Sequence, residues 1–344
     1  MRRTQILASL AVASATFALP VAQANAVAPI RVSASLPASL SASLPLVRLH
    51  FSARVNASSL PALRVEPALA TKWQQIGPRD VQAVALSTLR PAVQYHFATP
   101  SSLACAARCV FQALRPHVAS VATNVAWEDQ LLAQLHYLPL NFTPTSTALT
   151  PSTQVSGTYS WSFPSLPSQL FAQWQVGVDN VVLRGALMNF QSTQNLPTTG
   201  VADVVTWNRL IAAANAGQVN TRPYDYVDVA ESSPESLTLY VNGQATFHTL
   251  VNTGISVAPT ATGTYAVYLR YTSQTMSGTN PDGTHYSDPG IPWVSYFNGG
   301  DALHGFLRAS YGWPQSLGCV EMPYAAAKVV WPFTRIGTLV TVRS

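Results

Sequence analysis

The sequence predicts a mainly β protein that contains one small helical module. Short alternations of apolar and polar residues recur near both ends of the chain, as in half-buried strands. An Asn-Gly pair, Asn242-Gly243, separates two of these alternations and is the strongest short-range signal for a hairpin. Apolar residues at helical spacing are concentrated in the middle of the chain, around 183–190. With 344 residues, the chain is long enough for two or three domains.

The composition excludes several classes of protein. Charged residues make up 10% of the chain and hydrophobic residues 48%, whereas a typical charged share is about 25%. A disordered chain or a coiled coil needs many more charges. The formal net charge is +5 without a run of Lys or Arg, so no nucleic-acid partner is expected. A mildly basic face toward an anionic polymer stays open.

Residues 1–26 have the pattern of a secretory signal peptide. Arg2 and Arg3 precede an apolar stretch from Ile6 to Leu19, and Ala24-Asn25-Ala26 matches a small-x-small cleavage site. The alternative is an uncleaved membrane anchor, but the stretch is short for a span of about 20 residues. We therefore expect a secreted protein, extracellular or periplasmic, with no membrane span after signal removal.

The three cysteines divide into a close pair and one single residue. In an oxidising compartment, Cys105 and Cys109 are expected to form a local disulfide. Two buried free thiols are the alternative. Cys319 is left without a partner, and an unpaired thiol in an exported protein favours a reactive role.

Residues 27–120 predict a small β-sandwich of immunoglobulin-like type that serves as a spacer. A Ser/Ala/Pro-rich tract, Ser33–Pro45, is expected to be a linker. A helical insert is expected to carry Cys105 and Cys109. The predicted strands of this region are Val47–Ala53, Ala62–Val65 and Val93–Phe97.

Residues 121–218 predict the helical module. Helices are expected at Asp129–Leu135, around 183–190, and from Thr206 to Ile211. A helix ending in Phe-Gln, a glycine turn and a Thr-Trp-x-x-Leu helix together resemble a peptidoglycan-binding domain, which is a three-helix bundle. The resemblance implies glycan binding; a purely structural helical spacer is the alternative.

Residues 222–344 predict a β-sandwich closed by short helices. A mobile loop is expected at Ser273–Pro289, because Ser, Gly, Asn and Asp dominate it. The helix in this region is predicted at Tyr324–Val330. The predicted strands are Leu237–Val241, Gln244–Thr249, Thr264–Leu269 and Thr338–Val342.

The residues with chemistry lie between His304 and Met322. Breaking or exchanging an amide needs a nucleophile, a base and donors for the oxyanion. The thiol of Cys319 can supply the nucleophile, and the imidazole of His304 can supply the base. Gly318 permits a tight turn that directs backbone N–H groups to one point. The two residues are expected on neighbouring strands.

The phrases His304-Gly305 and Ser316-x-Gly318-Cys319-Val320 resemble the signature of an L,D-transpeptidase catalytic domain (YkuD-like). The resemblance covers residues 223–343. It implies a cysteine acyltransferase that joins peptidoglycan stem peptides by 3→3 cross-links, without metal or cofactor. It also implies sensitivity to carbapenems and a place in the cell wall.

The resemblance implies a role for each matching residue. Cys319 matches the nucleophile, His304 the base, and Gly305 the residue whose carbonyl orients the imidazole. Residues implied at the oxyanion hole or beside the substrate are Ser316, Leu317, Gly318 and Tyr296. For the aromatic residues Trp293, Tyr296 and Phe297, a place in the core is an equal alternative to a substrate wall.

Two positions depart from the pattern. Leu317 stands where many members have a second histidine, so the proton transfers are expected to depend on His304. Glu321 stands where members often have Arg or Asn, so recognition of charged groups on the stem is expected to differ. Two alternatives stay open: an L,D-carboxypeptidase that uses the same residues with water as acceptor, and an inactive wall-binding protein.

Overall fold

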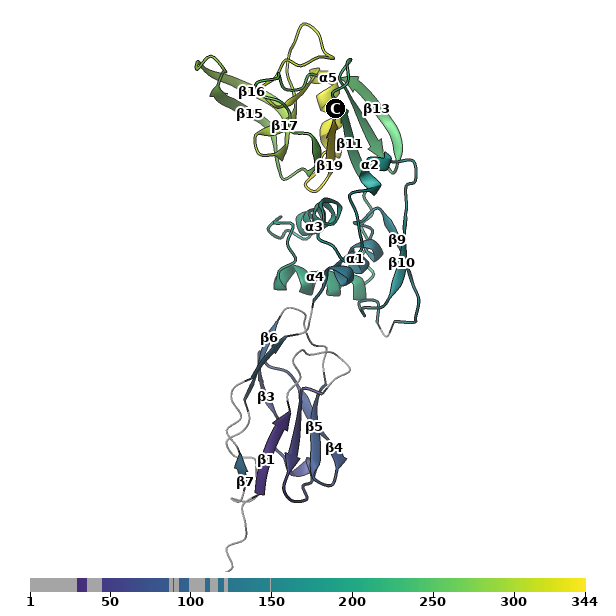
Figure 1. Ribbon diagram of the computed structural model, residues 1–344, viewed down its shortest axis with the longest axis vertical. Helices are drawn as coiled ribbons and strands as arrows, with labels where there is room; N and C mark the ends of the chain where they lie inside the picture. The colour runs from purple at the N-terminus through teal and green to yellow at the C-terminus, as the bar shows by residue number, and fades with distance from the viewer. Residues whose placement is uncertain are drawn as a thin grey trace, which may run out of the picture.

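The computed structural model describes residues 30–35, 45–86, 89, 93–98, 109–111, 117–120, 123–148 and 150–344. Figure 1 shows sheets at both ends of the long axis and a group of helices between them. The chain is therefore mainly β with a helical part in the middle, as the sequence predicted.

The N-terminal part contains two sheets. Alternating Val47, Leu49 and Phe51 turn toward a core that also receives Val65 and Phe97 from the second sheet. The first sheet has the order β4(Thr71–Gly77), β5(Asp80–Ala85), β2(Val47–Phe51), β1(Ile30–Ser35) and β7(Cys109–Phe111). The second consists of β3(Arg64–Glu66), β6(Gln94–Ala98) and β8(His117–Ser120), and a 3-10 turn, η1, spans Ala57–Ser59.

Two expectations for this part are wrong. Ser33 to Ser35 belong to β1, where they pair with β2, so the first residues of the expected linker Ser33–Pro45 are a strand. Cys109 begins β7, which pairs with β1, and is not in a helical insert. Cys105 lies outside the described residues, as do the signal peptide and 36–44, so the disulfide stays a prediction.

Three helices form the middle part, α1(Val125–Gln134), α3(Val181–Thr193) and α4(Val204–Asn215). Each begins at an Asn or Asp whose side chain accepts a hydrogen bond from a backbone N–H three residues on; these are Asn124, Asn180 and Asp203. The cap at Asn124 starts α1 four residues before the predicted helix. A hairpin of β9(Leu140–Pro144) and β10(Gly157–Trp161), followed by α2(Ser168–Phe171), separates α1 from α3.

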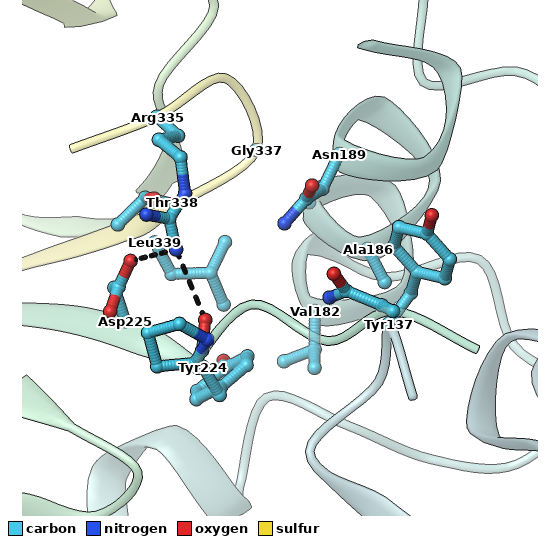
Figure 2. A pocket seen from close by; sticks show the side chains of 13 residues that line it. Tyr137, Val182, Ala186, Asn189, Tyr224, Asp225, Arg335, Gly337, Thr338 and Leu339 are labelled. Atoms are coloured by element: carbon cyan, nitrogen blue, oxygen red, sulfur yellow. Dashed lines mark hydrogen bonds and ion pairs between the residues drawn. The ribbon is translucent and has the colours of Figure 1, made fainter. Parts of the chain in front are cut away.

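The helical part packs directly on the C-terminal sheets. Its core includes Tyr226 and Leu339 from those sheets. Gly185 of α3 meets Gly337: a Cβ at 185 would lie 2.7 Å from the Gly337 carbonyl oxygen. Figure 2 shows Arg335 close to Gly337 and joined to Asp225. Arg335 also donates to the carbonyl of Pro223. The cavity left at this junction measures about 10 Å³, the lower limit for one water, so the two parts are closely fitted.

The C-terminal part is a sandwich of two sheets. Its shared core takes apolar side chains from both sheets and from α5(Tyr324–Val330), which is followed by η2(Trp331–Phe333). One sheet has the order β13(Gln244–Leu250), β12(Ser236–Val241), β11(Asp225–Ala230), β19(Leu339–Arg343) and β14(Gly263–Ala266). The other has the order β15(Leu269–Thr279), β16(His285–Asn298), β17(Asp301–Gly305) and β18(Val320–Met322).

Local predictions in this part are mostly confirmed. The predicted strand Thr264–Leu269 is instead divided between β14, which ends at Ala266, and β15, which begins at Leu269. Asn242 and Gly243 have φ of 48° and 78°, as a tight hairpin requires. The helix Tyr324–Val330 has the predicted bounds. The expectation of a mobile loop at Ser273–Pro289 is wrong. These residues form most of a long hairpin of β15 and β16, whose turn lies near Asn280–Gly283. The polar residues of this segment pair across the two strands, and composition alone does not predict such pairing.

Within the described ranges, no helix combines the length and the apolar content needed to cross a bilayer.

Candidate active site

Parallel pairing of two short strands brings the two sequence motifs together. In the register of β17 and β18, Leu303 is opposite Val320 and His304 is opposite Glu321. Cys319 immediately precedes β18, one position before the residue that is opposite Leu303. Residues that are distant in sequence thus become neighbours through backbone hydrogen bonds.

The imidazole of His304 is buried and held by its neighbour. Its Nδ1 lies 3.1 Å from the carbonyl oxygen of Gly305, and only 3% of the residue is exposed. Because a carbonyl oxygen can only accept, Nδ1 carries the proton and Nε2 keeps its lone pair. Burial lowers the pKa of His304, although the Gly305 carbonyl opposes this shift. The imidazole is therefore neutral and basic at Nε2.

The turn before Cys319 is fixed by a serine and a glycine. The Oγ of Ser316 donates to the carbonyl of Cys319 at 2.5 Å and accepts from the N–H of Gly318 at 3.2 Å. Gly318 has φ of +113°, which L side chains rarely adopt. Ser316 thus closes the turn with its side chain, and the Gly318 N–H is engaged inside it.

A buried carboxylate that sequence reasoning missed supports this turn. Glu235, 1% exposed, accepts from the backbone N–H of Thr253 at 2.6 Å and from its hydroxyl at 2.7 Å. The carbonyl of Thr253 in turn accepts from the N–H groups of Gln315 and Ser316. Glu235 and Thr253 are 18 positions apart and belong to no motif, so no sequence signal could have joined them.

Cys319 and His304 both line one open cleft of about 610 Å³. The tip of the β15–β16 hairpin contributes Asn280, Pro281 and Asp282 to its wall. Other lining residues include Ile255, Met276, Tyr286, Asp288, Phe306, Arg308, Gln315, Ser316, Leu317 and Glu321. The hairpin therefore forms part of one wall of the cleft.

The thiol of Cys319 is protonated in this environment. Burial raises its pKa to about 12, even though the N–H of Ala302 hydrogen-bonds to it and lowers the pKa. The charges of Asp301 and Glu321 also raise it. The hydrogen bond of the thiol goes to the carbonyl of Gly300, with Sγ and oxygen 3.7 Å apart. The resting pair is thus a neutral thiol and a neutral imidazole.

Trp293, Tyr296 and Phe297 are not among the described residues that line the cleft. Phe297 is 3% exposed in the main core, and Trp293 packs on that core. Tyr296 packs beside Cys319 in a small cluster around Ile291. Tyr286 lines the cleft instead, and was missed because its segment was interpreted as a loop.

Leu317 occupies the rim of the cleft and is 36% exposed. An apolar side chain at this point can neither donate nor accept a proton. Among the described residues that line this cleft, His304 is the histidine found together with Cys319.

Residues 224–342 match the sequence profile of the L,D-transpeptidase catalytic domain, also named YkuD. This C-terminal part of the chain is an L,D-transpeptidase catalytic domain, as the motif resemblance predicted. A search of curated proteins gave no match.

Solved L,D-transpeptidases are similar to this chain. The Enterococcus faecium enzyme is 22% identical, with 40% of this chain and 62% of that chain covered and a TM-score of 0.33. The chain therefore spans less than two thirds of that protein. The Mycobacterium smegmatis enzyme is 10% identical, with 92% and 100% covered and a TM-score of 0.32. L,D-transpeptidase 3 from Mycobacterium tuberculosis, solved with a faropenem-derived adduct, is 12% identical, with 91% and 94% covered and a TM-score of 0.31.

Proposed function

We propose that this protein is a secreted L,D-transpeptidase that forms 3→3 cross-links in peptidoglycan through a thioester on Cys319. The observation that carries the proposal is the shared cleft: the thiol of Cys319 and the imidazole of His304 line one opening, and the cleft belongs to an L,D-transpeptidase domain. No metal or cofactor enters the proposed reaction.

The reaction begins with a proton transfer. Because both groups are neutral, the thiol proton moves to Nε2 of His304 while sulfur attacks the carbonyl of the diamino acid in a donor tetrapeptide. The C–N bond to the terminal D-Ala breaks, the imidazolium protonates the leaving amine, and a thioester remains. An amine of a second stem then attacks the thioester, gives its proton to His304 and releases the thiol.

Backbone amides are proposed to hold the oxyanion of the tetrahedral intermediate. The N–H of Gly318 already donates to Ser316, so the amides of Leu317 and Cys319 are the proposed donors. Ser316 supports this role by fixing the turn, and Tyr296 packs against the same small apolar cluster as Cys319.

The other parts of the chain fit a wall enzyme. The helical part around 125–215 is proposed to bind peptidoglycan glycan, and the N-terminal sheets to act as an immunoglobulin-like spacer. The expected secretory signal would direct the protein across the cell membrane. The expected disulfide Cys105–Cys109 suits the oxidising compartment outside that membrane.

The test uses purified protein and a disaccharide-tetrapeptide, with products identified by mass spectrometry. A cross-linked dimer with loss of D-Ala supports the transpeptidase. Free tripeptide alone would instead identify an L,D-carboxypeptidase. Unchanged substrate, together with no carbapenem adduct on Cys319, would favour an inactive wall-binding protein.

Two variants locate the reaction. Cys319→Ala is expected to abolish turnover and adduct formation while the fold is retained. Cys105→Ser is the matched control and is expected to keep turnover. The carbapenem probe is chosen because the Enterococcus faecium catalytic domain has been solved acylated by ertapenem.

A further inference from the structure

One ion pair connects the segment after His304 with the strand after Cys319. Nε of Arg308 lies 2.7 Å from Oε2 of Glu321, and Nη2 lies 2.8 Å from Oε1. This is a bidentate geometry, which fixes the plane of the guanidinium as well as its position. Arg308 is four residues after His304, and Glu321 is opposite His304 in the strand pairing.

The pair presents its positive end to the cleft. The side chain of Glu321 is 5% exposed, whereas that of Arg308 is 31% exposed. The guanidinium also lies over the ring of Phe306, 4.6 Å from its centroid, and Nη2 donates to the carbonyl of Gln315. The carboxylate is thus a buried support, and the cation is the accessible partner.

Part of the guanidinium is free to bind a ligand. Nε and Nη2 have acceptors, but Nη1 has none within the part of the chain that the structure describes. Nη1 carries two N–H donors, which suit the oxygens of a second carboxylate.

Apart from Arg308, the described residues that line the cleft offer an anion no permanent positive charge. Among the described residues that line it, Arg308 alone is permanently cationic, since the imidazole of His304 is neutral. Asp282 and Asp288 line the cleft from the β15–β16 hairpin and repel an anion from that side. A ligand carboxylate is therefore directed to Arg308.

We propose that Arg308 is the specificity-determining residue that binds a carboxylate of the donor stem, and that Glu321 is the positioning residue that holds it. The inference rests on the proposed function, since it needs a stem peptide in this cleft. The shared chemistry is a carboxylate. Its source is either the terminal D-Ala or an internal acidic group of the stem.

The experiment compares three donors with the wild-type protein: the tetrapeptide with free carboxylates, its C-terminal amide, and the tetrapeptide with amidated internal carboxylates. Amidation of the recognised carboxylate is expected to lower kcat/KM about 10- to 100-fold, the range for a hydrogen-bonded charge. The amidated donor whose kcat/KM falls identifies the carboxylate that Arg308 binds. Equal kcat/KM for all three donors would overturn the proposal.

Arg308→Gln is expected to lower kcat/KM for the free donor by the same factor and to remove the preference among donors. Arg308→Lys, which keeps the charge but not the fork, is expected to retain part of the preference. A merely structural role of Arg308 predicts equal losses with every donor, and that result would contradict the proposal.

Arg343→Gln is the matched control. Arg343 forms a similar pair with Asp228 in the same domain, at 3.0 Å between Nη2 and Oδ2, and does not line this cleft. It is expected to keep the wild-type donor preference.

Failure of the proposed function is distinguishable. If the wild-type protein turns over none of the donors, binding of the same three peptides to Cys319→Ala, measured by calorimetry, decides the role of Arg308 separately. A free-carboxylate preference that Arg308→Gln abolishes supports the proposal, and equal binding of all three peptides refutes it.

Discussion

Gly318 lies directly against the carboxylate of Asp301. A Cβ at position 318 would be 2.7 Å from Oδ1 of Asp301, and φ of Gly318 is +113°. The other oxygen of Asp301 accepts from the N–H of Ala261 at 3.1 Å, which holds the carboxylate in place. The turn that presents Cys319 therefore admits glycine and resists any other residue.

Gly318→Ala should lower activity much more than stability. The added Cβ must displace either the turn or Asp301, and a shift of about 1 Å at a reacting atom can cost roughly 100-fold in rate. The rate of carbapenem acylation, followed by mass spectrometry, measures the loss. Gly217→Ala is the control, because Gly217 also has positive φ, +62°, but has open space around it. Equal acylation rates for both variants would contradict the prediction.

Glu235→Gln should loosen the support of the turn that precedes Cys319. In glutamine, an NH2 group takes the place of one of the two carboxylate oxygens. Either the backbone N–H or the hydroxyl of Thr253 then loses its acceptor, and one buried hydrogen bond is not made. Such a loss costs roughly 1–3 kcal/mol, and we expect this decrease in the free energy of unfolding in urea. Glu66→Gln, at an exposed position, should change it little. The prediction fails if the two variants are equally stable.

The pH profile of alkylation should report the protonated thiol. Because the pKa of Cys319 is raised to about 12, the thiolate fraction and the rate should rise about tenfold per pH unit from neutral pH to beyond pH 9. Iodoacetamide labelling of the peptide containing Cys319, quantified by mass spectrometry, tests this. In an unfolded sample, the rate of alkylation should level off at a pH near the ordinary cysteine pKa. A plateau of the folded protein below pH 8 would indicate a thiolate–imidazolium pair instead.

Gly185→Ala should destabilise the junction between the helices and the C-terminal sheets. In a free helix the change stabilises by up to about 1 kcal/mol. Here the new Cβ meets the Gly337 carbonyl at 2.7 Å, and overpacking against backbone typically costs about 1–3 kcal/mol. Thermal unfolding decides the sign. Gly300→Ala, with nothing within 4 Å of the added atom, should leave the melting temperature nearly unchanged.

Local signals predicted much of the fold. The Asn242-Gly243 hairpin, the helix from Tyr324 to Val330 and the amphipathic pattern of α3 depend on neighbours in sequence, and all three are confirmed. The hairpin of β15 and β16 was missed because its polar residues are held by cross-strand pairing, which composition does not encode. The strand at Cys109 was missed for a similar reason, since its partner is 79 residues away in β1.

The candidate site was predictable where one motif contains its own geometry. His304 and Gly305 are adjacent, and the turn from Ser316 to Cys319 is continuous, so the sequence located both. Glu235 and Arg308 act through partners on other segments. Their places depend on how β12, β17 and β18 assemble, and short-range patterns contain no information on that assembly.

In the proposed reaction, the pairing of β17 with β18 separates the reacting side chains from the residue that selects the donor. His304 is held in the ladder between the strands and Cys319 directly precedes β18, while Arg308 belongs to the connecting loop. If the domain acts as proposed, exchanging that loop for one of different charge is expected to change the donor preference while the pairing of β17 with β18 is kept. Engineering of donor preference has a natural insertion point between Phe306 and Gln315.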